Sequence, residues 1–282
     1  MTRLSTLPTW LAERLGTDEL DRALGRLREE MPAHDPWGFS PEEARLYALV
    51  NLAFYRYFRT EVHGIEHLPR GRVLIVPNHS GQLPYDGLVV SMACLLDADP
   101  PRWVRSMVER WVPTLPFINV AMARSGAVLG DPVNCRNLLR QDNAILVFPE
   151  GARGSGKTFW KRYQLERFGR GFMRLALETD TPIVPVSVVG AEEAVVSLVD
   201  LKPLARLFGA PYFPVTPLLP VLGPLQTLPL PTRFYLDFGE PLRFEGPADD
   251  EDEAIDRKVE VVRQAVRTSI EKRLAARPGV FG

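Results

Sequence analysis

The sequence has few cysteines, little net charge and no long hydrophobic run. Its 282 residues include only two cysteines, Cys94 and Cys135, too few for a disulfide framework or a cysteine-based metal site. We therefore expect two free thiols in a reducing compartment. The formal net charge is −1, so the chain lacks the overall positive charge that is typical of nucleic-acid-binding proteins. We expect no nucleic-acid partner.

The chain also lacks targeting and membrane-spanning signals. No apolar stretch approaches the length of about 20 residues that a membrane-spanning helix needs. The first residues, MTRLSTLPTWLAERLG, contain neither the apolar centre nor the small-residue cleavage site of a signal peptide. The 45% of hydrophobic residues is enough for one large domain with a substantial core. These features predict a protein that can touch a membrane without crossing it.

Residues 1–60 have a helical pattern. Thr17 precedes leucines at helical spacing, Leu20, Leu24 and Leu27. The segment Ser40-Pro-Glu-Glu43 predicts a capping box with proline at the first helical position, which opens a helix that runs to Thr60. This helix is apolar around much of its circumference. It fits two interpretations, a helix packed on the core or a helix that rests among lipid head groups.

From residue 61 the pattern changes to apolar strands that alternate with helices. The predicted strands are 73–77, 144–148, 183–189 and 233–238, and the predicted helices are 86–96 and 167–178. Buried strands separated by helices predict an α/β fold with a largely parallel sheet flanked by helices. The proline-rich residues 203–232 predict irregular extended chain that covers the core or touches lipid. We expect three units: an N-terminal helical, candidate membrane-docking segment (1–60), a catalytic domain (61–245) and a C-terminal helix packed on it (246–282).

A histidine and an aspartate follow the first predicted strand, in the segment VLIVPNHSGQLPYDGLVV. His79 lies just past the strand, where α/β enzymes place their chemistry, and Asp86 follows seven positions later. Gly81 and Pro84 disfavour a helix between them, so the loop can bend back and bring the two side chains together. The Asp86 carboxylate would then orient the imidazole, whose other nitrogen could take a proton from a substrate hydroxyl. The alternative is a structural histidine that caps the loop.

A glycine-rich, basic segment follows the second predicted strand: FPEGARGSGKTFWKR. Backbone amides of a glycine-rich turn, together with Arg153 and Lys157, suit a phosphate or an anionic head group. Residues 151–158 also match the P-loop pattern, and the acid at Asp200 imitates a magnesium-binding motif, so a nucleotide hydrolase or kinase is an alternative. Against it, Glu150 directly precedes the first glycine, and a P-loop leaves His79 unexplained.

The segments NHSGQLPYD and FPEG, in this order, resemble the glycerolipid acyltransferase family, which includes the lysophosphatidate acyltransferases. The resemblance covers roughly residues 61–242, although six residues separate His79 from Asp86 where the family has four. It implies that His79 is the catalytic base and Asp86 its partner. It further implies that the acyl acceptor and its phosphate are held by Glu150, Gly151, Arg153, Lys157 and, in the segment FINVAMAR, Arg124. The strand at 183–186 resembles the family's proline-bearing fourth motif.

The resemblance implies transfer of a fatty acyl group from acyl-CoA or acyl carrier protein to a hydroxyl of a lysophospholipid or glycerol-phosphate-type lipid. It implies no metal and no cofactor other than the acyl donor. The expected partners are the donor, the lipid acceptor and a membrane surface, with the protein peripheral on the cytoplasmic face. A lipid-binding relative without activity and a thioesterase are the remaining alternatives.

Overall fold

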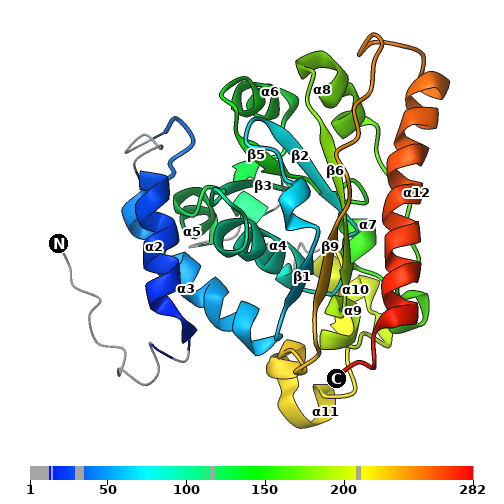
Figure 1. The fold of residues 1–282 in the computed structure, drawn as a ribbon. Coiled ribbons are helices and arrows are strands. Elements are labelled where there is room, and N and C mark those ends of the chain that lie inside the picture. The colour runs from blue at the N-terminus through cyan, green and yellow to red at the C-terminus, as the bar shows by residue number, and fades with distance from the viewer. Residues whose placement is uncertain are drawn as a thin grey trace.

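The computed structural model describes residues 13, 15–28, 35–110, 112–114, 118–207 and 211–281. The helical prediction for residues 1–12, 14 and 29–34 and the phenylalanine of the FINVAMAR segment, Phe117, lie outside these ranges. Within them, a seven-stranded sheet stands between helices that cover both of its faces (Figure 1). In this part of the chain, no helix is both long and apolar enough to cross a bilayer.

The main sheet is largely parallel. Its strands are β1 (Glu61–His63), β2 (Val73–Pro77), β3 (Val104–Val108), β4 (Val128–Leu129), β5 (Ala144–Leu146), β6 (Ile183–Val189) and β9 (Tyr235–Phe238). Their spatial order is β1-β9-β6-β2-β5-β3-β4. The strands from β6 to β4 run parallel to one another, whereas β9 is antiparallel to β6 and carries β1 in parallel beside it. The predicted α/β class with a mostly parallel sheet is therefore confirmed.

Two groups of helices cover the two faces of the sheet. The helices are α2 (Thr17–Arg28), α3 (Pro41–Tyr57), α4 (Tyr85–Leu96), α5 (Ile118–Arg124), α6 (Pro132–Arg140), α7 (Ala152–Ser155), α8 (Gly171–Thr179), α9 (Ala191–Ala194), α10 (Lys202–Leu207), α11 (Leu219–Leu222) and α12 (Asp252–Ala276). Buried residues of α2, α3 and α4 form one core cluster with the sheet, and those of α6, α8 and α12 form another. Figure 1 shows α12 running along the side of the sheet opposite to α2 and α3.

The central strand β2 is buried on both faces. Val73 and Ile75 pack in the cluster with α3 and α4, and Leu74 and Val76 pack in the cluster with α6, α8 and α12. Successive side chains of a strand point to opposite faces, so a strand covered on both sides must be apolar throughout. This explains the unbroken apolar run of residues 73–77. Because β2 is the central strand, its carboxyl end lies in the middle of the sheet edge.

Two local predictions are wrong. Ser40 is the N-cap of α3, but its side chain makes no capping hydrogen bond, and the Glu43 carboxylate lies 3.6 Å from the Arg124 guanidinium instead. The capping box is therefore replaced by an ion pair to α5. Residues 203–232 are not simply extended chain, because they contain most of α10, the short strand β8 (Pro214–Val215), which pairs with β7 (Val199–Asp200), and α11.

Candidate active site

The candidate site lies at the carboxyl edge of the parallel strands. His79 follows β2, Glu109 follows β3, Glu150 follows β5 and Glu192 follows β6. Because these strands are parallel neighbours, their carboxyl ends meet at one edge of the sheet, where α/β proteins bind their ligands. Side chains that are far apart in the sequence therefore come together here.

His79 and Asp86 form a hydrogen-bonded pair. The Nδ1 atom of His79 lies 2.7 Å from Oδ2 of Asp86, whose side chain is fully buried at the start of α4. The same carboxylate accepts hydrogen bonds from the backbone N–H groups of Ser80, at 2.8 Å, and Gly87, at 2.7 Å. The loop bends back as expected, so six intervening residues still bring the two side chains into contact. His79 also lines the pocket described below, and Asp86 occupies its Nδ1 atom rather than its Nε2 atom.

The histidine loop is fixed from two further sides. The Asn78 side chain donates to the carbonyl oxygen of Val188 at 3.0 Å and accepts from its N–H at 2.8 Å, which ties the loop to β6. The Phe148 ring stacks on the imidazole, with centroids 4.2 Å apart and planes at 28°. The imidazole is thus held between a carboxylate and an aromatic ring, in a single orientation.

The charge of Asp86 sets the titration of His79. Burial alone lowers the pKa of His79, but the charge of Asp86, its hydrogen bond and the nearby Glu150 carboxylate raise it, and the net pKa lies above the ordinary value of 6.5. The imidazole can take a proton only when it is neutral. If His79 is the base, its catalysis is therefore lost as the pH falls through this raised pKa.

Substitution of Asp86 by asparagine should move this titration to lower pH. Asp86→Asn removes the charge that raises the pKa of His79 and leaves the burial that lowers it. We expect the acid limb of kcat/KM to shift to lower pH, with the plateau rate reduced by about 10²-fold because the imidazolium loses its partner. A pH–rate profile on protein with unchanged circular dichroism checks this. A limb that stays in place would show that His79 is not the titrating base.

Glu150 braces the histidine loop from within the protein. Its side chain is fully buried, with Oε1 accepting from the His79 N–H and Oε2 from the Glu166 N–H, both at 2.8 Å. Gly154 lies directly beneath, where an added Cβ would come within 2.7 Å of the Cβ atoms of both Glu150 and His79. No larger residue fits at this glycine without moving the candidate base. The geometry gives Glu150 a positioning role, whereas its contact with an acceptor stays a prediction.

Lys157 lies inside the protein under the same loop. Its side chain is 4% exposed, and its ammonium group lies 2.8 Å from a Glu192 oxygen and 3.7 Å from a Glu150 oxygen. It also donates to the backbone oxygen of Gln164 at 3.0 Å. Burial lowers the pKa of Lys157, but the two carboxylates outweigh burial and raise it, so the ammonium stays charged. Lys157 therefore neutralises buried acids, and its ammonium group is not exposed to solvent as a surface phosphate ligand would be.

The other predicted binding residues lie at the surface. Arg153 is exposed on α7, and one of its nitrogens lies 3.4 Å from the backbone oxygen of Arg167. Gly151 and Ala152, next to it, line the pocket described below, and Gly151 has a φ of +59°, which favours glycine. Arg124 ends α5 and pairs with Glu43, outside the residues that line this pocket. The structure therefore brings Arg153 close to the His79 loop but does not bring Arg124 to it.

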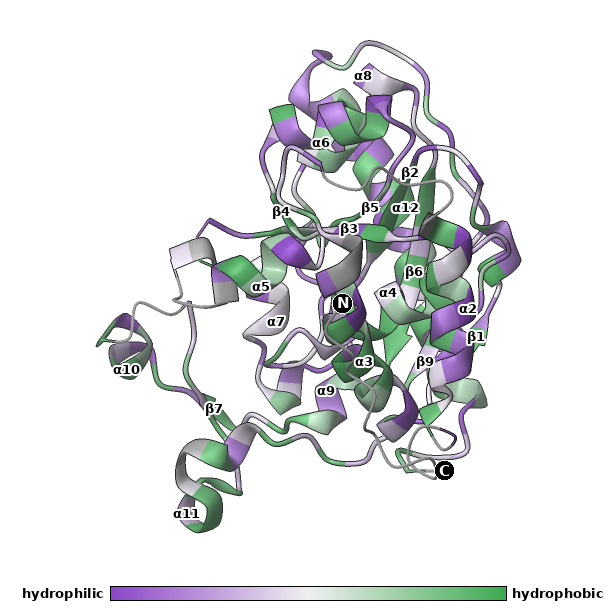
Figure 2. Ribbon diagram, turned by 90° about the vertical axis from the view of Figure 1, so that its left-hand side faces the viewer, coloured by the Kyte–Doolittle hydropathy of each residue, from purple (hydrophilic) through white to green (hydrophobic). Residues whose placement is uncertain are grey.

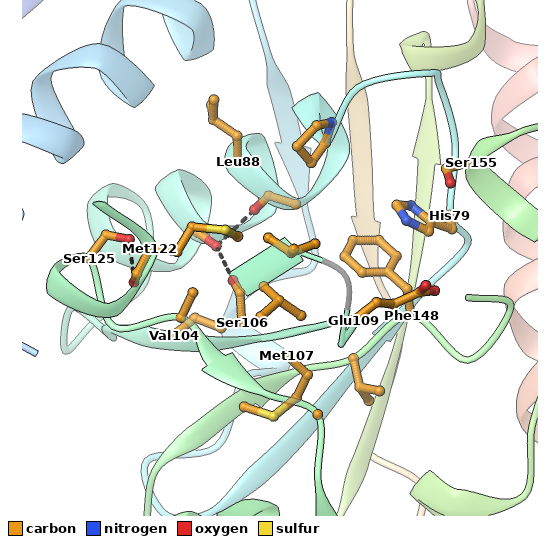
Figure 3. A pocket seen from close by; sticks show the side chains of 18 of the residues that line it. His79, Leu88, Val104, Ser106, Met107, Glu109, Met122, Ser125, Phe148 and Ser155 are labelled. Carbon is orange, nitrogen blue, oxygen red and sulfur yellow. Dashed lines mark hydrogen bonds between the residues drawn. The ribbon is translucent and has the colours of Figure 1, made fainter. Parts of the chain in front are cut away.

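A large pocket extends from His79 between the sheet and the helices. Its volume is about 1020 Å³, at the upper end of the range of about 300–1,000 Å³ that is usual for small-molecule sites. Figure 3 shows His79, Glu109 and Ser155 gathered at one end of the pocket, and Met122 and Ser125 at the other. The intervening walls are mostly apolar, and they include Leu88, Met92, Leu95, Val104, Met107 and Val147. Tyr47 and Asn51 of α3 also line the pocket.

Some roles at the site were not predicted from the sequence. Phe148 was predicted in a strand and in the FPEG segment, but not as the ring that orients the imidazole. Arg110 lines the pocket just after β3, on the same edge as His79. The strand β3 was missed because its sequence, VRSMV, carries a buried arginine, Arg105, which lies 2.5 Å from an Asp35 oxygen. Recognition of that strand would have placed Arg110 at the carboxyl edge.

The P-loop interpretation is wrong. Its lysine, Lys157, is buried in an ion pair, whereas a P-loop lysine must reach the nucleotide phosphates. The glycine-rich segment folds into the four-residue helix α7, and Asp200 lies in the small second sheet, where it accepts a hydrogen bond from the Phe213 N–H at 2.9 Å. Among the described residues, moreover, no three His, Cys, Asp or Glu side chains gather as metal ligands would.

Comparison with known proteins agrees with this geometry. The model of the acyltransferase family matches residues 59–189. An uncharacterized protein of Mycobacterium bovis is 40% identical over 88% of this chain and 71% of its own length. A chicken (Gallus gallus) protein named as a DGAT1/2-independent enzyme synthesizing storage lipids is 24% identical over 66% of this chain and 52% of its own length.

A solved structure gives the same fold. The crystal structure of the 1-acyl-sn-glycerophosphate acyltransferase of Thermotoga maritima superposes with a TM-score of 0.51 at 18% identity, covering 82% of each chain. At this identity the likeness speaks for the fold alone. The family model and the 40% identical relative lead to one conclusion, with which the paired His79 and Asp86 agree: the chain belongs to the acyltransferase family.

Proposed function

We propose that this protein transfers a fatty acyl group from acyl-CoA or acyl carrier protein to a hydroxyl of a lysophospholipid or glycerol-phosphate-type lipid. The observation that carries the proposal is the Asp86-bound imidazole of His79, which opens into a large and mostly apolar pocket. A base beside an apolar cavity suits a reaction whose acyl chain must leave water while its carbonyl is attacked.

In the proposed reaction, Nε2 of His79 takes the proton of the acceptor hydroxyl as its oxygen attacks the thioester carbonyl. Asp86, bound to Nδ1, holds the imidazole in place and stabilises the positive charge that it gains. The tetrahedral intermediate then expels the thiolate, which receives the proton from His79. The new ester bond replaces the thioester bond, and the imidazole returns to its neutral form without a covalent enzyme intermediate.

The shape of the pocket supports a place for the acyl chain. Its walls between α3, α4 and β3 carry leucine, methionine and valine side chains, which would bury the methylene groups of a fatty chain. Each buried methylene group contributes about 0.8 kcal/mol. An acyl chain that runs away from His79 along these walls would leave its carbonyl carbon beside the base.

Two arginines near His79 are candidates for holding an acceptor phosphate. Arg110 lines the pocket, and Arg153 is exposed beside pocket-lining Ala152. We expect Arg153→Ala to raise the KM for a phosphate-bearing acceptor about tenfold and to leave the KM for the acyl donor nearly unchanged, because a charged hydrogen bond to phosphate is lost. Initial rates with each substrate varied in turn measure this. Equal effects on both constants would contradict a role in acceptor binding.

The proposed function is tested by thiol release from long-chain acyl-CoA, and separately from acyl carrier protein, with and without a panel of lysolipids. Release that depends on the acceptor, together with a diacylated product in mass spectrometry, supports the transferase. Release without any acceptor identifies a thioesterase. Lipid binding without release from either donor identifies a relative that has lost activity.

We further propose that the protein works as a peripheral protein on the cytoplasmic face of a membrane. Its proposed acceptor is a lipid, which resides in a bilayer, and its two cysteines, Cys94 and Cys135, are free thiols in the described structure.

A further inference from the structure

A projecting part of the chain, residues 199–230, leaves the body of the protein beside the site. This segment, which we name the apolar arm, contains β7, α10, β8 and α11, and its residues 208–210 lie outside the described structure. Figure 2 shows α10, β7 and α11 standing out from the body of the protein. The reaction mechanism proposed above uses no group of the arm.

The arm exposes large apolar side chains to its surroundings. Val221 is 80% exposed, Leu207 75% and Leu225 60%. From residue 207 to residue 232 the sequence contains no Asp, Glu, Lys, Arg or His. A projecting surface segment of a soluble protein normally carries charge, because water solvates it on several sides. The outer surface of the arm is therefore more apolar than a water-exposed surface segment normally is.

Two polar side chains in the uncharged part of the arm, Thr216 and Gln226, are turned inward. Thr216 and Gln226 are 3% and 4% exposed, and they form hydrogen bonds with each other. The Thr216 N–H donates to Oε1 of Gln226 at 2.9 Å, and the Thr216 hydroxyl donates to the Gln226 backbone oxygen at 3.0 Å. The arm thus has its paired polar groups inside and its leucine and valine side chains outside. An apolar environment favours this arrangement, because a polar group without a hydrogen-bond partner is costly there.

Hydrogen bonds tie the arm to the site. The Tyr212 hydroxyl donates to the backbone oxygen of Gln82, in the loop between His79 and Asp86, at 2.9 Å, and Tyr212 lines the pocket. At the other end, the Tyr57 hydroxyl donates to the Pro229 oxygen at 2.8 Å. A surface on which the arm rests would therefore lie close to the pocket.

From these observations we infer that the apolar arm inserts its exposed leucine and valine side chains into the surface of an anionic lipid bilayer. The charges on α10 favour this occupant. Lys202 and Arg206 are exposed on α10, beside the exposed Leu204 and Leu207. Cations next to an inserted apolar surface meet anionic head groups. The inference deepens the proposed function by naming the contact through which the protein reaches its lipid acceptor, but lipid binding itself does not require catalysis.

The test uses the full chain and vesicles made of equal parts of phosphatidylcholine and phosphatidylglycerol. The double variant Val221→Asp/Leu225→Asp puts two charges on the outer surface of the arm. The matched control, Val133→Asp/Val261→Asp, changes valines that are 55% and 51% exposed on α6 and α12. We expect the arm variant to bind vesicles about tenfold more weakly or worse than wild type, and the control to bind as wild type does. We also expect wild-type binding to weaken on pure phosphatidylcholine.

Thermal melting of both variants checks that they fold, and thiol release from a short-chain acyl-CoA with a water-soluble acceptor checks the chemistry without a membrane.

An arm variant that binds vesicles like wild type overturns the inference, as does a wild type that binds no vesicles. Wild-type dimers that the arm variant separates, without vesicle binding, would assign the arm to a second copy. Lost vesicle binding in a protein that shows no thiol release in any form would support the inference while contradicting the proposed function.

Discussion

Substitution of His79 by alanine should reduce acyl transfer by about 10³-fold or more while the protein stays folded. The proposed reaction loses a base that a buried carboxylate holds in place beside the pocket, and a positioned general base contributes about 10²–10⁴-fold. The fold should survive because Asp86 keeps the backbone N–H donors of Ser80 and Gly87, so its buried carboxylate is not left without partners. Acceptor-dependent thiol release, measured with saturating donor, gives the size of the loss.

The matched control is His63→Ala. His63 lies on the edge strand β1, where it pairs with Glu61 at 2.8 Å, and its side chain is 44% exposed. This variant should keep wild-type rates. If folded His79→Ala protein transferred acyl groups as fast as the His63→Ala protein, His79 would not be the base, and the proposed mechanism would be wrong.

Substitution of Lys157 by methionine should cost about 3–5 kcal/mol in the free energy of unfolding at neutral pH. Its ammonium group is buried with two carboxylates, those of Glu192 and Glu150, and removal of one member of a buried ion pair leaves the other uncompensated. Since the orphaned carboxylates are tolerated best in their protonated form, the loss should grow as the pH rises and shrink as it falls. Urea unfolding followed by circular dichroism at several pH values measures this.

Two further variants make the Lys157 experiment specific. Lys161→Met, at an exposed position on the same segment, should change the stability by less than about 0.5 kcal/mol. The double variant Lys157→Met/Glu192→Gln should recover part of the lost stability, because it restores the balance of buried charge. A Lys157→Met protein as stable as the Lys161→Met protein would mean that the buried ion pair does not exist as described.

Strand prediction succeeded where burial on both faces makes a strand apolar throughout. β6 was predicted to the residue and β2 likewise, because both lie in the centre of the sheet. β3 was missed because Arg105, paired with Asp35 and packed over the Trp37 and Phe39 rings, breaks the apolar pattern of a buried strand. Its partners come from another part of the chain, and no local pattern shows them.

The same limit explains the outcome for the site. The contact between His79 and Asp86 is made within one loop, so loop chemistry allowed it and the family resemblance led to its prediction. The burial of Lys157 depends on its ion pair with Glu192. Glu192 follows β6 and lies 35 positions further along the chain, so no local pattern reveals the pair. From the sequence alone, a lysine in a glycine-rich, basic segment looked like a phosphate ligand.

This difference between local and distant contacts has an evolutionary consequence. The candidate base, its carboxylate partner and the N–H groups that hold that carboxylate lie within one short loop, and Asn78 fastens this loop to β6 through the backbone carbonyl and N–H of Val188. The pocket walls come from other elements, including α3, α4 and β3. Mutations can therefore alter those walls, and with them the shape that a substrate must fit, without changing any residue of the His79 loop.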